Sequence, residues 1–125
     1  MTRESFMKNL WRWKCGLKED EEPKPVGSYQ EIYDESWSDE FERLMHVQII
    51  MGAFRYGRWS ERRAKNIKYD YVAFIKRRLD MYQETGNTEY LVDAANGAML
   101  AFEFDQHPTK HFYTVDDGEH DKRIL

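Results

Sequence analysis

A thin line of acidic and amide side chains crosses an otherwise apolar segment of this sequence, residues 87–104. Glu89, Asp93, Asn96 and Glu103 form the line, and a helical period of 3.6 residues places them within roughly 80° of one another. Glu89 and Asp93 stand one helical turn apart, so both can point at a single Mg²⁺ ion, and Asn96 can then orient a water or a ribose. Glu89, Asp93 and Asn96 are therefore the candidate catalytic residues, and Glu89 and Asp93 are the candidate metal ligands.

The same line has a structural alternative. Glu89 stands where the dipole of a helix N-terminus favours a negative charge. Asp93 or Asn96 can bond to a neighbouring backbone, or to an arginine of the basic segment that precedes them. The line is thus either a site or a polar seam, and the sequence leaves both interpretations open.

A second group of residues that could do chemistry lies at the junction between two expected helices. Arg55 and Arg58 stand beside Tyr56 and Trp59, which offers positive charge for a phosphate and ring faces for stacking a base. A helix that begins at Ser60 would add backbone amides, which also attract anions. The alternative is a turn in which the rings anchor packing and the arginines are solvated. The expected anion-binding residues are Arg55, Arg58, Trp59, Arg62 and Arg63.

The net charge of −4 conceals a segregation of charge along the chain. Residues 55–78 hold 9 basic and 2 acidic side chains, whereas residues 1–54 hold 7 and 11 and residues 79–125 hold 3 and 10. Such a basic segment attracts phosphate, nucleic acid or an acidic protein surface, unless the acidic segment that follows neutralises it. Nucleic-acid binding is the weaker interpretation, because the whole chain is acidic and no recognised reading module is present.

Length and composition indicate one soluble domain. The chain has 125 residues, of which 41% are hydrophobic and 34% are charged, and this is enough for a modest core. No apolar run approaches the length that crosses a bilayer, and the charged segment 1–8 lacks the apolar core of a secretory signal. We therefore expect a cytoplasmic protein without membrane contact.

The spacing of apolar residues predicts an all-α protein, a small antiparallel helical bundle of three main helices. Ser38 or Ser36 caps the first helix, and Gly57 and Gly86 end the first and the second. The three helices are expected at residues 38–56, 60–84 and 87–105.

The remainder of the chain is expected to be less regular. Residues 1–37 form an irregular aromatic N-terminal arm with an acidic linker, residues 38–113 form the helical domain, and residues 114–125 form a loose, flexible C-terminal tail. Residues 29–37 of the arm are expected to be extended, and residues 111–113 are expected to form a packed turn.

The helices differ in the apolar surface that they must bury. The third helix carries an apolar arc broader than a surface helix needs. This arc and the aromatic residues of the arm would be hard to cover in one three-helix unit, so we expect a homo-oligomer. In the first helix the expected buried side chains are Phe41, Leu44, Met45, Val47, Ile50, Met51 and Phe54.

The segment around the third helix has a distinctive order of residues. Residues 82–96 read Tyr-Gln-Glu-Thr-Gly-Asn-Thr-Glu-Tyr-Leu-Val-Asp-Ala-Ala-Asn, and an apolar run then leads to His107-Pro108 and His111-Phe112. This order resembles a segment of short uncharacterised proteins encoded by bacteriophages and prophages, most clearly over residues 71–113 and more weakly over residues 51–57. The resemblance implies a phage accessory protein that acts inside a bacterium, in the cytoplasm of the host, and it carries no known activity.

The spacing of Glu89 and Asp93 is also weakly similar to an acid pattern of the MazG-type all-α nucleoside triphosphate pyrophosphohydrolases. Those enzymes hold Mg²⁺ on acids from two helices, in an EExxE pattern on one and ExxD on the next. Here the two acids are four residues apart instead of three, and the first expected helix offers only Asp39, Glu40 and Glu42 near its start. The departure removes much of that metal cage.

Two functions of different class follow. In the first, the protein binds without catalysis or cofactor, through its basic helix surface, and its partner is a host or defence protein or an anionic nucleotide. In the second, it is a Mg²⁺-dependent nucleoside triphosphate pyrophosphohydrolase, in which Glu89 and Asp93 hold the ion, Asn96 places a water, and Arg55 and Arg58 take phosphates. The binder is favoured, because one polar line on one helix is an incomplete metal site.

Overall fold

A computed structural model describes residues 27–65 and 68–115 of the chain. These residues divide into two compact units, one formed by residues 36–107 and the other containing residues 27–35 and 108–115. Every regular element in this part of the chain is an α-helix, which confirms the expected all-α class. None of these helices combines the length and the apolar character that a membrane span requires. The expectations for residues 1–26 and 116–125 lie outside the described residues.

Helix α2, Tyr29–Ser36, belongs to the smaller unit except for its last residue. The expectation of an extended arm at residues 29–37 is therefore wrong. The helix begins because the hydroxyl of Ser28 accepts a hydrogen bond from the backbone N–H of Glu31 at 3.1 Å, as in an N-cap, and Glu31 places a negative charge in the first turn. The packed turn expected at residues 111–113 is also wrong, since the rings of Phe112 and Tyr113 are exposed.

Helix α3, Asp39–Tyr56, is the first element of the larger unit and agrees with the expected helix. The hydroxyl of Ser38 accepts a hydrogen bond from the N–H of Phe41 at 3.0 Å, which caps the N-terminus. The helix ends because Gly57 takes a positive φ of 87°, a conformation that other residues rarely adopt. The N–H of Gly57 closes the last turn by bonding to the carbonyl of Ala53.

The single helix expected over residues 60–84 is two helices, α4, Trp59–Ala64, and α5, Tyr71–Thr85. The break has a local cause at Asp70, whose carboxylate accepts a hydrogen bond from the N–H of Ala73 at 3.0 Å. A short acidic side chain that bonds to the backbone ahead of it favours the start of a helix over the interior of one.

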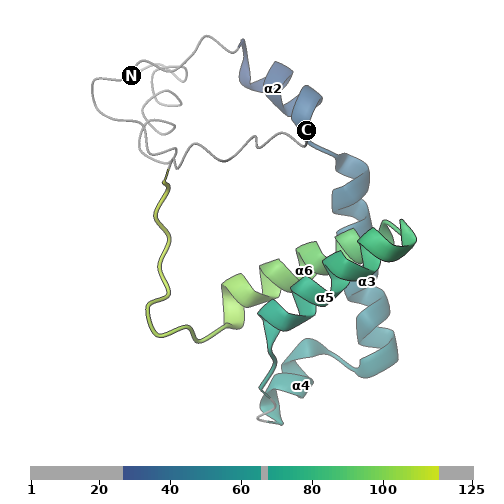
Figure 1. Ribbon diagram of the computed structural model, residues 1–125, viewed down its shortest axis with the longest axis vertical. Helices are drawn as coiled ribbons and strands as arrows, with labels where there is room; N and C mark the ends of the chain where they lie inside the picture. The colour runs from purple at the N-terminus through teal and green to yellow at the C-terminus, as the bar shows by residue number, and fades with distance from the viewer. Residues whose placement is uncertain (1–26, 66–67, 116–125) are drawn as a thin grey trace. The chain divides into compact units, whose positions relative to one another are not determined.

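Helices α5 and α6, Glu89–Phe104, form a hairpin around the turn at Gly86, whose φ is +71°. They pack along each other in the larger unit, and α6 also packs against α3 (Figure 1). Among the residues that the structure describes, the buried ones are Val92, Ala94, Asn96 and Gly97, and all four belong to α6. Helix α6 is thus the centre of the larger unit, and the other helices are arranged around it.

Helix α3 buries only part of its apolar surface. Phe41, Leu44 and Met45, which were expected to be buried, are only half-buried. The expectation that Val47, Ile50, Met51 and Phe54 are buried is wrong, because all four are exposed, and 82% of the Phe54 surface is accessible. These four residues recur at helical spacing, so they form one apolar face that points away from α6.

Gly97 lies in the contact between α6 and α5. A Cβ atom on Gly97 would stand 2.9 Å from Cδ1 of Phe74 and 3.0 Å from Cγ1 of Ile75, both on α5. Such distances are too short for carbon atoms, so a side chain here would force the helices apart or twist Phe74 out of its rotamer.

We expect Gly97→Ala to lower the free energy of unfolding by about 1–3 kcal/mol, because a methyl group would overpack the helix contact. Gly52→Ala is the matched control, since Gly52 also lies inside a helix but a Cβ atom there would meet nothing within 4 Å. This control should gain up to about 1 kcal/mol from helix propensity. Urea denaturation of both variants measures the difference, and equal effects would show that the contact at Gly97 is not restrictive.

Candidate functional site

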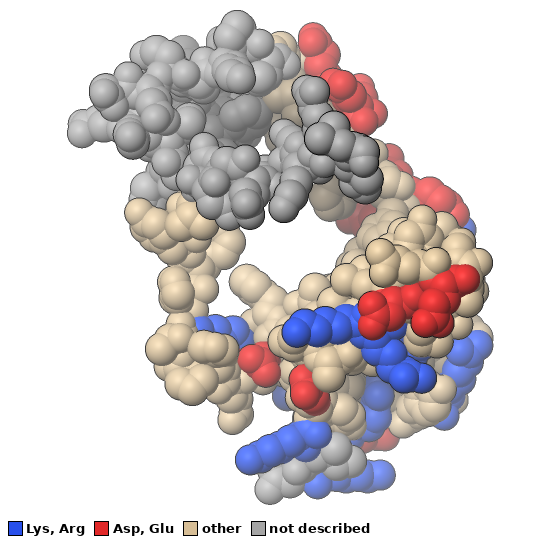
Figure 2. Space-filling model, in the orientation of Figure 1, with Lys and Arg blue, Asp and Glu red and all other residues tan. Residues whose placement is uncertain are grey.

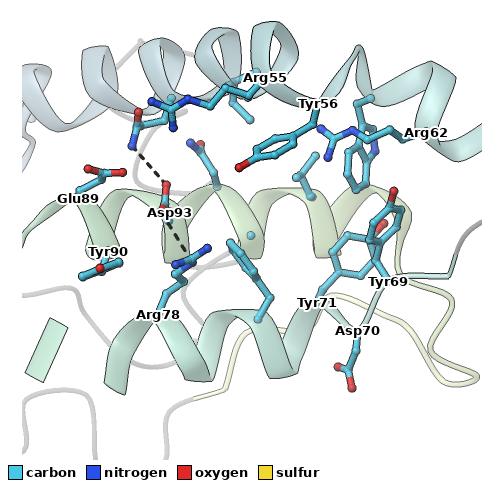
Figure 3. A pocket seen from close by; sticks show the side chains of 18 residues that line it. Arg55, Tyr56, Arg62, Tyr69, Asp70, Tyr71, Arg78, Glu89, Tyr90 and Asp93 are labelled. Carbon is cyan, nitrogen blue, oxygen red and sulfur yellow. Dashed lines mark hydrogen bonds and ion pairs between the residues drawn. The ribbon is translucent and has the colours of Figure 1, made fainter. Parts of the chain in front are cut away.

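A cleft of about 550 Å³ opens between α3, α5 and α6 within the larger unit. Helix α6 runs between the other two, and side chains from all three helices converge on the cleft (Figure 3). Its lining combines positive charge, negative charge and aromatic rings, the mixture that fixes the orientation of a small ligand. The lining residues that matter most for chemistry are Gln48, Arg55, Tyr56, Trp59, Arg62, Tyr69, Tyr71, Phe74, Arg78, Glu89, Tyr90, Asp93 and Asn96.

One end of the cleft is charged. Arg55 of α3 and Arg78 of α5 lie on either side of α6, which contributes Glu89 and Asp93 (Figure 3). Oδ2 of Asp93 and Nε of Arg78 are 3.8 Å apart, an ion pair that is too long for a hydrogen bond. The other carboxylate oxygen of Asp93 accepts a hydrogen bond from the Gln48 amide at 3.4 Å. Asp93 is therefore held by α3 and α5 together.

Two titrating groups of the cleft lining, the carboxyl group of Asp93 and the hydroxyl of Tyr71, have a pKa that burial raises. Burial raises the pKa of Asp93 above its ordinary value, because the protein interior disfavours the charged form. Arg78 acts against this rise and the negative charge of Glu89 adds to it, while Gln48 and Arg55 lower the pKa more weakly. The balance shows that the neighbouring arginines do not fully offset the burial of this acid.

The carboxamide of Asn96 lies in the wall of the cleft at the centre of α6. Only 6% of the residue surface is accessible. Its Nδ2 donates a hydrogen bond of 3.0 Å to the backbone carbonyl of Met45, which ties α6 to α3. Its Oδ1 is buried and has no hydrogen-bond partner.

The other end of the cleft is aromatic. The ring of Trp59 lies 4.8 Å from that of Tyr69 and 6.2 Å from that of Tyr71, measured between ring centroids. The guanidinium of Arg62 lies 4.6 Å from the Trp59 ring centroid, within the range of a cation–π contact. These contacts anchor the short helix α4 to the start of α5 and place one arginine against the aromatic end.

Unpaired polar atoms concentrate in this cleft. Within residues 27–65 and 68–115, four buried side-chain nitrogen or oxygen atoms lack a hydrogen bond: Nε1 of Trp59, Nε of Arg62, Nε of Arg78 and Oδ1 of Asn96. All four belong to residues that line the cleft. Buried polar groups in proteins are nearly always paired, so a cluster of exceptions at one place calls for a bound partner such as a ligand or ordered water.

The sequence-predicted site residues divide between this cleft and other places. Both groups predicted from the sequence contribute to the cleft, namely Glu89, Asp93 and Asn96 from one and Arg55, Trp59 and Arg62 from the other. Arg58 instead occupies the N-cap position of α4, and the guanidinium of Arg63 lies over the ring of Phe104, 4.2 Å from its centroid. Glu103, the last member of the polar line, is exposed and does not line the cleft.

Arg78 and Gln48 were not singled out as site residues from the sequence. Each is one of several polar residues on a long helix, so its spacing does not distinguish it. Both become part of the site through Asp93. Gln48 forms a hydrogen bond with Asp93, 45 residues away in the sequence, and Arg78 forms an ion pair with it. The ion pair also shows that part of the basic segment is neutralised internally. Lys and Arg gather over α4 and α5, and some adjoin Asp or Glu on the face in Figure 2.

The fold and the cleft define a small all-α protein with a mixed arginine, acid and aromatic site. Comparisons of this chain with protein-family models, curated proteins and solved structures gave no match. The chemistry of the cleft is therefore the basis for assigning a function.

We expect the stability of the protein relative to Asp93→Asn to fall as the pH rises. The raised pKa of Asp93 means that the native state holds its proton more tightly than the unfolded chain, whose carboxyl group titrates near 3.8. The stabilisation that the protonated Asp93 gives the native state is thus fully present below the pKa of the unfolded chain. It is lost as the pH rises through the higher pKa of the native state. Urea unfolding at about pH 3, 5 and 7 measures it. A constant difference between the two proteins would contradict the perturbed titration.

Proposed function

We propose that this protein binds a small anionic ligand of the nucleotide type in the cleft, without catalysis. The observation that carries the proposal is the cluster of buried, unpaired polar atoms in the lining. Three of them, on Trp59, Arg62 and Arg78, are N–H donors without a hydrogen bond, and the Arg78 donor also lies 3.8 Å from the Asp93 carboxylate in an ion pair. Donors on arginine favour an anionic acceptor such as a phosphate or carboxylate.

The aromatic side chains support a ligand that also carries a flat ring. Tyr56, Trp59, Tyr69 and Tyr71 all line the cleft, and its volume of about 550 Å³ is within the range of small-molecule sites. Aromatic faces stack on nucleobases of any identity, and guanidinium groups bind phosphates. A nucleotide joins both features in one molecule of suitable size.

The proposal is tested by thermal-shift measurements of the full chain with nucleoside mono-, di- and triphosphates, cyclic nucleotides and NAD-derived compounds, with and without Mg²⁺. A ligand at 100 times its dissociation constant adds about 2.7 kcal/mol of stability. We expect a shift that does not require Mg²⁺, with the ligand recovered intact. No shift with any of these compounds would overturn the proposal.

Substitutions of Arg62 and Arg78 test whether the ligand that causes the thermal shift binds in the cleft. We expect Arg62→Gln and Arg78→Gln each to weaken binding about tenfold or more, because a hydrogen bond between charged groups is lost. Lys76→Gln is the matched control, since Lys76 is an exposed cation on α5 that does not line the cleft. Isothermal titration calorimetry measures the three affinities, and equal losses in all of them would indicate general electrostatic attraction.

The runner-up is a Mg²⁺-dependent nucleoside triphosphate pyrophosphohydrolase, supported by the position of Glu89 and Asp93 in the same cleft, one turn apart on α6. Mg²⁺ often takes one or two carboxylates and completes its shell with water and substrate phosphates. The fit is incomplete, because Asp93 is paired with Arg78 and the acids of the α3 first turn do not line the cleft. No reaction step is therefore assigned to the metal.

The enzyme alternative predicts Mg²⁺-dependent release of pyrophosphate from a nucleoside triphosphate. Glu89→Gln and Asp93→Asn should then abolish the release while the fold, measured by circular dichroism, is kept. Glu103→Gln should have no effect, because this acid of α6 is exposed and outside the cleft. Turnover that survives in both cleft variants would remove this alternative.

The wider biological setting is part of the proposal. The resemblance to phage-encoded proteins supports a role inside a bacterial host, in which a sequestered nucleotide or a bound host or defence protein would be the target. The exposed apolar face of α3, formed by Val47, Ile50, Met51 and Phe54, supports contact with a protein, including a second copy of this chain. Nucleic-acid binding remains the weaker option.

A further inference from the structure

We infer that Asn96 is a specificity-determining residue of the cleft, which selects anionic nucleotides whose base carries an exocyclic amino group. This inference rests on the proposed function and adds the chemistry that the ligand must present to α6. It follows from the orientation of one buried carboxamide and from the atom that this orientation leaves unpaired.

The orientation of the Asn96 carboxamide is fixed by its neighbour. Its partner is the backbone carbonyl of Met45, 3.0 Å away, and a carbonyl oxygen can only accept a hydrogen bond. The NH₂ group must therefore face Met45. A flipped amide would place two acceptor oxygens against each other, so Oδ1 is fixed as the free end.

The free end is an acceptor without a donor. Oδ1 of Asn96 is buried and unpaired, on a residue that lines the cleft and is 94% buried, since only 6% of its surface is accessible. The other three unpaired atoms of the cleft are donors. A complementary ligand therefore offers acceptors to the two arginines and Trp59, and one N–H donor to Asn96.

An amino-substituted base meets this requirement. The phosphate of a nucleotide supplies the acceptors, the ring supplies a face for stacking, and the exocyclic amine of adenine, guanine or cytosine supplies N–H donors. A base without the amine would leave the buried Oδ1 without a hydrogen-bond partner. Sites that pair a buried polar group with the ligand discriminate strongly against analogues that lack the partner.

The test uses two pairs of nucleotides that each differ by one amino group. The first pair is adenosine 5′-monophosphate and purine riboside 5′-monophosphate, and the second is guanosine 5′-monophosphate and inosine 5′-monophosphate. Calorimetry on the full chain should show, in at least one pair, binding about tenfold tighter for the aminated nucleotide. Equal affinities within both pairs would overturn the inference while the proposed function stands. Absence of binding by all four would overturn both.

Substitution of Asn96 identifies the residue that reads the amine. Asn96→Leu keeps a similar volume and removes the acceptor, so the affinity ratio within the discriminating pair should fall from about tenfold to near one. Lys76→Gln should keep the ratio of the original protein. A ratio that stays near tenfold in folded Asn96→Leu would overturn the role of Asn96. If Asn96→Leu does not fold, Asn96→Ala provides the same comparison, because it also removes the acceptor and has a smaller side chain.

Discussion

The close contact between α5 and α6 at Gly97 is the constraint on which the larger unit depends. Every buried residue among those that the structure describes in this unit lies on α6, and a side chain at position 97 would collide with Phe74 and Ile75 of α5. The side chain that rests on Gly97, Phe74, also lines the cleft, and the guanidinium of Arg78 lies 4.8 Å from the centre of its ring. The contact therefore sets the backbone packing and, through Phe74, the position of the arginine that faces Asp93.

Charge is arranged in the cleft so that opposite groups limit the penalty of burial. A carboxylate such as Asp93 is unfavourable in a partly buried place, and Arg78 and Gln48 offset only part of that penalty. Within the part of the chain that the structure describes, the buried side-chain atoms without a hydrogen bond all belong to residues that line the cleft. Such concentration is typical of binding sites, where a ligand completes the hydrogen bonds that folding leaves open. The same arrangement gives α6 two roles, as the core of the unit and as one wall of the site.

Local signals made much of the fold predictable. Ser38 and Gly57 bound α3 as expected, and Gly86 separates α5 from α6 as expected, because caps and positive-φ glycines act within one turn of the chain. The sequence did not predict the break between α4 and α5 at Asp70. An acidic residue within a helical pattern of apolar residues can be either a surface residue of one helix or the N-cap of the next. Glu89, Asp93 and Asn96 could be grouped from helical spacing alone. Their partners Arg78, Gln48 and Met45 could not, because those contacts depend on how α3 and α5 pack against α6.

The hydrogen bond between Asn96 and the Met45 carbonyl spans 51 residues, whereas the helices of the α5–α6 hairpin are joined by a turn of only a few residues. Contacts between neighbours in sequence form quickly, because little chain entropy is lost when the loop closes. The hairpin can thus assemble first, with Gly97 against Phe74, and present α6 as a surface on which α3 docks afterwards. On this route the cleft is the last part of the larger unit to form, since it does not exist until α3 has docked.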